Sequence, residues 1–152
     1  SGNRSALTPA ELAELRANQR IRCLGHVEDM QRVYAASDIV VLPSWREGLS
    51  RALIEAAAME RPIITTDVPG CRDVVDHGIS GLLVPQRDAR SLALAIRLLL
   101  ENSALAKSFG KAARQKVVAE FQVSLVNEFT LQQYSRLLAA SLDRKPLLEG
   151  LF

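Results

Sequence analysis

PSWREGLSRALIE, residues 43–55, is the stretch that decides how this chain folds. The apolar run Ile39–Leu42 precedes it and predicts a buried strand that ends at the proline. Residues Leu49–Met59 are rich in Ala, Leu and Glu and predict a helix. Glu47 and Gly48 therefore fall in a turn between a strand and a helix. In a parallel α/β sheet, ligands bind at such turns, at the carboxyl ends of the strands.

This turn and helix predict a binding site for a nucleotide sugar. A helix N-terminus offers free backbone N–H groups and a positive dipole to a phosphate. At about 1.5 Å per residue, Glu55 lies roughly 10 Å along the helix axis from Gly48. That spacing suits a diphosphate at the helix tip, sugar hydroxyls on Glu47 and ribose hydroxyls on Glu55. Gly48 is expected to serve an unusual backbone turn, a close approach of the phosphate, or both.

Each of these residues also has a plain structural explanation. Glu47 complements a helix dipole, Ser50 suits a helix N-cap, and Arg51 is placed for an i, i+4 ion pair with Glu47. Glu55 is also explained as an ordinary exposed helix glutamate. Its neighbours in the helix are apolar or small, however, which predicts a buried helix on which a carboxylate needs partners.

Strands and helices alternate along the rest of the chain. The expected strands are Ile21–Leu24, Ile39–Leu42, Pro62–Thr66 and Gly81–Val84, and Cys23 is expected to be a core residue. The expected helices are Pro9–Asn18 with a Thr8 capping box, a short one after Asp29, Leu49–Met59, Gly70–Asp76, one capped by Asp88 to Glu101, one capped by Ser103 to Glu120, and Ser124–Leu142. This order predicts an α/β, Rossmann-like parallel sheet with helices on both faces and additional C-terminal helices.

The composition of the chain argues against several classes of protein. The chain has 152 residues, one domain's length, with 48% apolar and 24% charged side chains, as in soluble globular proteins. A net charge of +2, without basic runs interleaved with aromatics, argues against a nucleic-acid partner. No apolar run approaches the ~20 residues that span a bilayer, and no signal peptide is visible, so a cytoplasmic location is expected. The two cysteines lack the spacing of a metal site.

Several short motifs, in order and with matching spacing, resemble the C-terminal domain of retaining GT-B glycosyltransferases, specifically family 4. The resemblance covers roughly residues 20 to 140, and part of it is similar to bacterial surface-polysaccharide transferases. The motifs are Gly25-His26-Val27-Glu28-Asp29, Ala35-Ala36-Ser37-Asp38-Ile39, Pro43-Ser44 with Glu47-x7-Glu55, Arg61-Pro62-Ile63-Ile64-Thr65-Thr66-Asp67-Val68-Pro69-Gly70, and Asp76-His77-Gly78-Ile79-Ser80-Gly81-Leu82-Leu83-Val84-Pro85.

The resemblance implies a retaining sugar transfer from a nucleotide diphosphate sugar, a UDP- or GDP-sugar, without a metal or other cofactor. The acceptor implied is a glycan or a polyprenyl-linked sugar, with the enzyme in the cytoplasm or peripheral on the inner face of the membrane. The site residues implied are Glu47 as the catalytic residue at the donor sugar, Gly48, Leu49 and Ser50 at the donor sugar and diphosphate, Glu55 at the ribose, and Val27, Asp29 and Arg32 around the base.

The resemblance further implies that residues 1–142 are part of a domain and that residues 143–152 are a tail. A whole N-terminal domain, two βα units and a basic pair that clamps the diphosphate would precede Ser1. The 152 residues by themselves are then expected to transfer no sugar and to bind nucleotides only weakly. They are also expected to hide an orphan sheet edge by self-association, or else to be disordered around 21–25.

Two other classes of function stay open from the sequence. One is a different GT-B enzyme: a sugar-nucleotide epimerase would convert the nucleotide sugar without an acceptor, and a phosphorylase would hold a lysine-bound pyridoxal cofactor. The other is a non-enzymatic module that binds a nucleotide sugar. His26 is expected to be a loop histidine rather than a catalytic acid, because no nucleophile or carboxylate constellation accompanies it.

Overall fold

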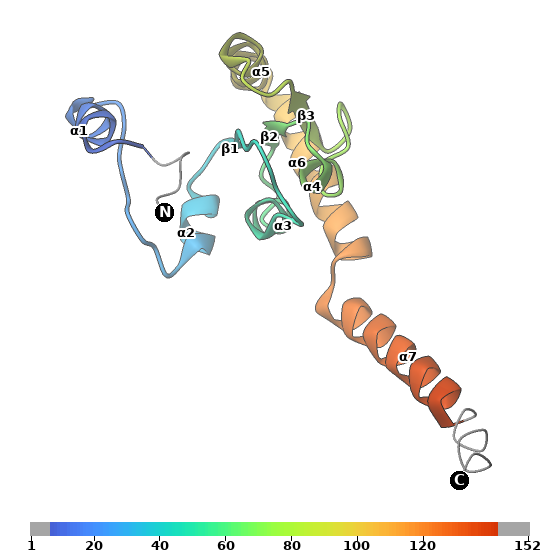
Figure 1. The fold of residues 1–152 in the computed structure, drawn as a ribbon. Coiled ribbons are helices and arrows are strands. Elements are labelled where there is room, and N and C mark those ends of the chain that lie inside the picture. Colours follow the sequence, from blue (N-terminus) through green and yellow to red (C-terminus); the bar gives the residue numbers. More distant parts are fainter. Residues whose placement is uncertain (1–6, 143–152) are drawn as a thin grey trace. The chain divides into compact units, whose positions relative to one another are not determined.

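The computed structural model describes residues 7–142, and the chain divides into two units, residues 1–30 and 31–152. The elements alternate much as the sequence predicts (Figure 1). In chain order they are α1 (Pro9–Ala17), α2 (Met30–Ala35), β1 (Val40–Leu42), α3 (Arg51–Ala58), β2 (Ile63–Thr66), α4 (Pro69–Arg72), β3 (Gly81–Val84), α5 (Ala89–Glu101), α6 (Ser103–Glu120) and α7 (Val123–Leu142).

In the first unit, α1 begins at the predicted capping box. The Glu11 N–H donates to Thr8 Oγ1 at 3.3 Å, and the Thr8 N–H donates to Glu11 Oε2 at 2.7 Å. These bonds satisfy helix-end donors, and the hydrogen bonds that the Glu11 carboxylate accepts from the Thr8 N–H and from the Thr8 hydroxyl lower its pKa. The helix ends at Ala17, one residue before the predicted end, with Asn18 as its C-cap.

The predicted strand Ile21–Leu24 is wrong. These residues adopt no strand, and the side chains of Ile21 and Leu24 are 40% and 48% exposed. A strand needs a hydrogen-bonded neighbour, and the sheet in the described part of the chain pairs only three other segments. Cys23 is exposed, so its predicted place in the core is wrong for the same reason.

The second unit is built on a parallel sheet with the order β1-β2-β3. Val40 pairs with Ile63 at one end, and Thr66 pairs with Val84 at the other. All four residues of the central strand β2 are buried, as expected for a strand that is covered by helices. The predicted α/β parallel fold is confirmed, with β3 at the predicted residues and β1 and β2 each one residue shorter at the start.

Helices pack against this sheet and close the core. α3 contacts β1 and β2, while α5 and α6 contact β2 and β3. The core cluster joins sheet and helix side chains, and it comprises Ile64, Leu82, Val84, Ala95, Leu99 and Phe109. The loops at the carboxyl edge of the sheet therefore start from strands that are packed into the core.

Two helix starts test the predicted caps. At α5 the prediction is confirmed, because Asp88 Oδ1 accepts from the Ser91 N–H at 3.0 Å. At α6 the cap is Asn102 rather than Ser103: Asn102 Oδ1 accepts from the Leu105 N–H at 3.0 Å, and Ser103 is the first helical residue. Asn and Ser both suit an N-cap, so the sequence alone does not show which of the adjacent residues Asn102 and Ser103 is the cap.

The helix predicted at Gly70–Asp76 is shorter and starts earlier. α4 begins at Pro69, whose fixed φ suits a first helical position, and ends at Arg72. The chain then turns toward β3 through Gly78, which has a φ of +75°.

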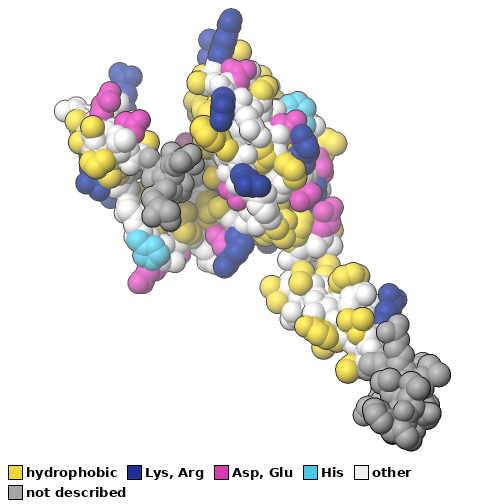
Figure 2. Space-filling model, viewed as in Figure 1, with side chains coloured by type: hydrophobic (Ala, Val, Ile, Leu, Met, Phe, Trp, Pro, Cys, Tyr) yellow, Lys and Arg dark blue, Asp and Glu magenta, His cyan; other side chains and the backbone are white. Residues whose placement is uncertain are grey.

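α7 carries many exposed apolar side chains, which Figure 2 shows along this helix. They are Val123, Leu125, Val126, Phe129, Leu131, Tyr134, Leu137 and Leu138. Among residues 7–142, no helix combines the length and apolar character required to cross a bilayer. The predicted tail at 143–152 lies outside the described residues.

Candidate functional site

Glu47 lies at the carboxyl end of β1, where the sequence places it, and its side chain is held by a neighbour. Ser44 Oγ donates to Glu47 Oε1 at 2.8 Å. The Ser44 carbonyl in turn accepts a hydrogen bond from Thr66 Oγ1, at the end of the central strand. The half-buried Glu47 carboxylate is therefore tied through Ser44 to β2.

The turn at Gly48 packs directly on the start of α4. A Cβ atom built on Gly70 would lie 1.5 Å from the Gly48 carbonyl oxygen and 2.7 Å from the Glu47 carbonyl oxygen. Only a glycine at position 70 lets these backbones approach so closely. Gly70 was not singled out from the sequence, because nothing in a local pattern shows which backbone will lie against it.

Gly48 itself has open space around it. A Cβ built there would meet no atom within 4 Å, and its φ is outside the left-handed range. The expectation that Gly48 serves an unusual backbone turn is therefore wrong: Gly70, not Gly48, accommodates the tight packing of this loop. The other explanation, close approach of a phosphate, stays a prediction that the open space permits.

The first turn of α3 follows this loop. Leu49 is exposed, whereas Ser50 is buried and occupies the N-cap position. The Ser50 side chain makes no capping hydrogen bond, although its carbonyl accepts from the Ile54 N–H at 3.2 Å. The first N–H groups of a helix have no partner within the helix, so the start of α3 keeps donors that a bound anion would satisfy.

Glu55 projects from α3 and has two partners. Arg51 Nη2 lies 3.6 Å from Glu55 Oε1, so Arg51 pairs with Glu55 and not with Glu47, the partner that the plain structural explanation of its spacing offered. Both Arg51 and Glu55 belong to the helix and are one turn apart, whereas Glu47 precedes it. The side chain of Glu55 is 43% exposed, which leaves it accessible to a ligand.

The second partner of Glu55 is Tyr34, which the sequence analysis did not assign to the site. Tyr34 on α2 is only 5% exposed. Burial raises the pKa of its phenol, and the Glu55 carboxylate raises it further by its charge and as a hydrogen-bond acceptor. A phenol on an apolar helix face needs a polar partner when buried, and this was the signal that could have found it.

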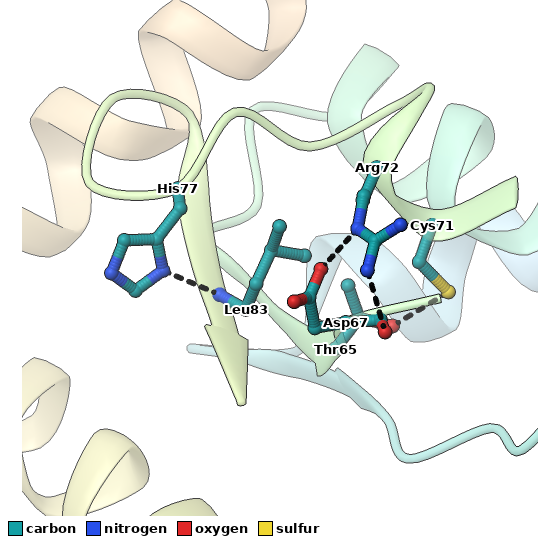
Figure 3. A network of polar contacts seen from close by, with 6 residues as sticks. All are labelled: Thr65, Asp67, Cys71, Arg72, His77 and Leu83. Atoms are coloured by element: carbon teal, nitrogen blue, oxygen red, sulfur yellow. Dashed lines mark hydrogen bonds and ion pairs between the residues drawn. The ribbon is translucent and has the colours of Figure 1, made fainter. Parts of the chain in front are cut away.

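The loop after β2 lies at the same edge of the sheet and holds a second polar group (Figure 3). Arg72 Nε forms an ion pair with Asp67 Oδ1, and Arg72 Nη2 lies 3.4 Å from the Asp67 carbonyl oxygen. The hydrogen bond from Arg72 holds the pKa of the Asp67 carboxyl below its usual value. The ion pair links Asp67, just after β2, to Arg72 at the end of α4, and so stabilises the segment that contains Gly70.

Two further side chains in Figure 3 are structural. Cys71 is fully buried, with its sulfur 3.1 Å from Thr65 Oγ1, and burial raises the pKa of the thiol, which keeps it protonated and unreactive. His77 Nδ1 accepts from the Leu83 N–H at 3.0 Å and so ties the turn before β3 to that strand.

The residues predicted around the base belong to different units of the chain. Arg32 is exposed on α2 in the second unit, while Val27 and Asp29 belong to the first unit. Their role stays a prediction. Within residues 7–142, no three His, Cys, Asp or Glu side chains cluster in a way that would hold a metal ion.

Comparison with known proteins places this arrangement in a family. Residues 2–102 match the family described as "Glycosyl transferases group 1". The chain is 32% identical over 127 residues to the capsular polysaccharide biosynthesis glycosyltransferase CapM of Staphylococcus aureus, covering 84% of this chain and 33% of that protein. It is 29% identical over 118 residues to an N,N'-diacetylbacillosaminyl-diphospho-undecaprenol alpha-1,3-N-acetylgalactosaminyltransferase of Campylobacter jejuni, covering 78% of this chain and 31% of that protein.

Solved structures of glycosyltransferases and related enzymes match the fold of this chain. Sucrose-phosphate synthase of Thermosynechococcus elongatus matches with a TM-score of 0.79 and 34% identity, over 85% of this chain and 33% of that one. TarM of S. aureus, in complex with fondaparinux, alpha-GlcNAc-glycerol and UDP, matches with a TM-score of 0.74 and 26% identity, over 81% of this chain and 25% of that one. The chain thus spans about a third of the length of the curated relatives described above. The parallel sheet and these matches agree: the chain belongs to the group 1 glycosyl transferases, and its fold matches that of GT-B glycosyltransferases.

Proposed function

We propose that this chain forms the donor-binding part of a retaining glycosyltransferase that uses a nucleotide diphosphate sugar. One observation carries the proposal. A carboxylate fixed at a strand end, Glu47, stands beside an open backbone position, Gly48, and the uncapped first turn of α3. This combination offers a sugar a hydrogen-bond acceptor and offers a diphosphate a set of donors within one short loop.

In this proposal the loop acts on the leaving group. The backbone N–H groups of Leu49 and Ser50, with the dipole of α3, stabilise the charge that develops on the diphosphate as the bond to the sugar breaks. Glu47 binds hydroxyls of the donor sugar beside the anomeric carbon. Ser44 positions Glu47 through its 2.8 Å hydrogen bond, so the carboxylate need not reorganise when the donor binds.

Glu55 is assigned to the ribose hydroxyls. Its side chain is 43% exposed, so the carboxylate is accessible to two hydroxyls of a ligand, and the buried Tyr34 contacts it from the protein side. The ion pair with Arg51 is exposed and long, so it costs little to replace by a ligand. Val27, Asp29 and Arg32 are proposed to surround the base.

The names of the relatives indicate which nucleotides and acceptors to test first. The TarM structure contains UDP, which makes UDP the first nucleotide to test, with GDP next. The CapM relative is named for capsular polysaccharide biosynthesis, and the Campylobacter jejuni relative is named for a diphospho-undecaprenol substrate. We therefore propose a glycan or lipid-linked acceptor and action in the cytoplasm, at the inner face of the membrane, with no metal needed for transfer.

A thermal-shift panel of UDP, GDP and ADP and of their sugars tests the proposal on the full-length protein to which this chain belongs. A ligand at about 100 times its Kd stabilises the folded state by about 2.7 kcal/mol, which is a shift of several degrees for a domain of this size. We expect one nucleoside diphosphate and its sugar to raise the melting temperature and the others to leave it unchanged. If no member of the panel shifts it, the donor assignment is wrong.

A further inference from the structure

A cation and an aromatic ring meet at the carboxyl edge of the sheet, outside the residues assigned above. The guanidinium carbon of Arg87 lies 4.4 Å from the centroid of the Trp45 ring. Trp45 follows β1 by three residues and precedes Glu47 by two, and Arg87 follows β3 by three. Because β1 and β3 flank β2, the pair bridges the loops of the two outer strands.

The backbone of Arg87 is in a conformation that an arginine rarely adopts. Its φ is +58°, in the left-handed region that favours Gly and Asn. Such a conformation is costly for a residue with a Cβ, and outliers of this kind gather where a side chain serves a ligand. At position 87 this conformation accompanies a guanidinium that lies over the indole of Trp45.

The charge of Arg87 is not neutralised within the described residues, where no carboxylate forms an ion pair with it. The adjacent Asp88 is engaged as the cap of α5 and accepts from both the Ser91 N–H at 3.0 Å and the Ser91 hydroxyl at 2.6 Å. Glu47 accepts from Ser44 Oγ. The carboxylates that lie closest in sequence to Trp45 and to Arg87 therefore have other partners.

Stacking leaves the guanidinium ready to bind an oxyanion. A guanidinium over a ring uses its face, whereas its N–H donors point outward in its own plane and match a phosphate in a bidentate way. The side chain of Trp45 is 56% exposed and Arg87 is exposed as well, so a substrate can reach the pair. The ring restricts the rotamers of the long arginine side chain, which lowers the entropy lost on binding.

We propose that Arg87 and Trp45 form a subsite for a phosphate or diphosphate group of the acceptor. The inference rests on the proposed transferase function, and it adds a second anion position to the one at the start of α3. The donor diphosphate is assigned to residues 48–50, directly before α3, whereas Arg87 comes from the loop after β3. Two anion positions from separate loops suit two phosphorylated substrates that meet at the sugar beside Glu47.

Trp45 makes the test direct, because it is the only tryptophan of the 152 residues. Its fluorescence reports on this subsite when the chain is titrated with farnesyl diphosphate, a short polyprenyl diphosphate, and separately with UDP. We expect farnesyl diphosphate to change the emission and to bind about tenfold more weakly to Arg87→Gln, as the loss of a charge-assisted contact implies. Arg87→Lys should retain part of the affinity.

Matched controls separate binding from folding. Arg90→Gln makes the same charge change three residues away and should leave farnesyl diphosphate affinity unchanged. Arg87→Gly keeps a residue that tolerates the positive φ and removes only the side chain, so it reports on the subsite even if Arg87→Gln folds poorly. UDP affinity, measured by calorimetry, should be the same in the wild-type chain and in all of these variants.

Two results with farnesyl diphosphate would overturn the inference: no binding to the wild-type chain, or the same affinity for the Arg87→Gly variant as for the wild type. A third result would also overturn it: if the Arg87 variants lost as much affinity for UDP as for farnesyl diphosphate, Arg87 would contact the donor instead. Failure here is distinguishable from failure of the proposed function. UDP binding that survives in every Arg87 variant upholds the donor site, whatever farnesyl diphosphate does.

Discussion

The carbonyl of Gly48 rests on the backbone of Gly70, so closely that a Cβ atom at position 70 would lie 1.5 Å from the Gly48 oxygen. This contact joins the loop after β1 to the start of α4 after β2. The contact holds the loop that carries Glu47 against α4. The hydrogen bonds of Ser44 with Glu47 and with Thr66 tie the same loop to the end of β2. The candidate site thus depends on the packing of two neighbouring loops as much as on its own residues.

Substituting Gly70 should therefore disturb both folding and binding. In Gly70→Ala the new methyl group meets backbone atoms, which cannot rotate away, so we expect a loss of stability of about 1–3 kcal/mol, as for an overpacked site. Nucleoside diphosphate affinity should fall as well, because the loop is displaced. Chemical denaturation and calorimetry measure the two effects.

Gly48→Ala is the matched substitution with the opposite expectation for folding. No atom lies within 4 Å of the added Cβ and the backbone is not left-handed, so the unfolding free energy should change little. Diphosphate affinity should nevertheless fall if the phosphate occupies that open space. Unchanged affinity together with unchanged stability would remove Gly48 from the diphosphate site.

Glu55→Gln should weaken binding of the nucleoside diphosphate by about 1–3 kcal/mol, the usual loss when a charge-assisted hydrogen bond is replaced by a neutral one. Isothermal calorimetry with UDP or GDP measures it. Glu101→Gln is the control, because Glu101 forms a similar exposed i, i+4 pair with Arg97, at 3.5 Å, on α5. Equal affinities for wild type and Glu55→Gln would reduce Glu55 to a structural helix residue.

Glu47→Ala should reduce sugar transfer more than it reduces affinity for the nucleoside diphosphate, because Glu47 is assigned to the sugar. In the protein that carries this chain, we expect turnover to fall roughly 10²-fold or more. Ser44→Ala should show a smaller effect of the same kind, since it frees the Glu47 carboxylate without removing it. Equal losses in turnover and nucleotide affinity would instead give Glu47 a role in the phosphate loop or in folding.

The ionisation of Tyr34 should depend on its burial and on the charge of Glu55. The chain has two tyrosines, so Tyr134→Phe leaves Tyr34 as the single phenol whose ionisation is visible in near-ultraviolet absorbance. We expect its pKa to lie above the ordinary value of about 10, and Glu55→Gln to lower it, because the variant removes the charge that opposes ionisation.

The same shift carries a stability effect of defined sign. The folded state holds the phenol proton more tightly than the unfolded chain does. The contribution is therefore fully present below about pH 10 and is lost as the pH rises through the raised pKa of Tyr34. Tyr34→Phe should flatten this part of the stability profile. An alkaline profile that is identical in Tyr34→Phe and wild type would contradict the linkage.

The sequence by itself determined those features whose causes lie within a few residues. The Thr8–Glu11 capping box, the Asp88 cap and the strand at Gly81–Val84 are at the predicted positions, because side-chain caps and apolar runs act locally. The turn that contains Glu47 is likewise a local pattern, and it falls between β1 and α3 as expected.

Tertiary structure decided what depends on partners distant in the chain. Ile21–Leu24 has the composition of a strand but adopts none, since a strand exists only when another strand pairs with it. Arg51 forms its ion pair with Glu55 and not with Glu47. Gly70, and not Gly48, is the glycine at which a Cβ atom would clash with neighbouring backbone. The contacts of Tyr34 with Glu55 and of Arg87 with Trp45 arise only when the sheet sets helices and loops side by side, and no periodicity along the chain records which side chains will then meet.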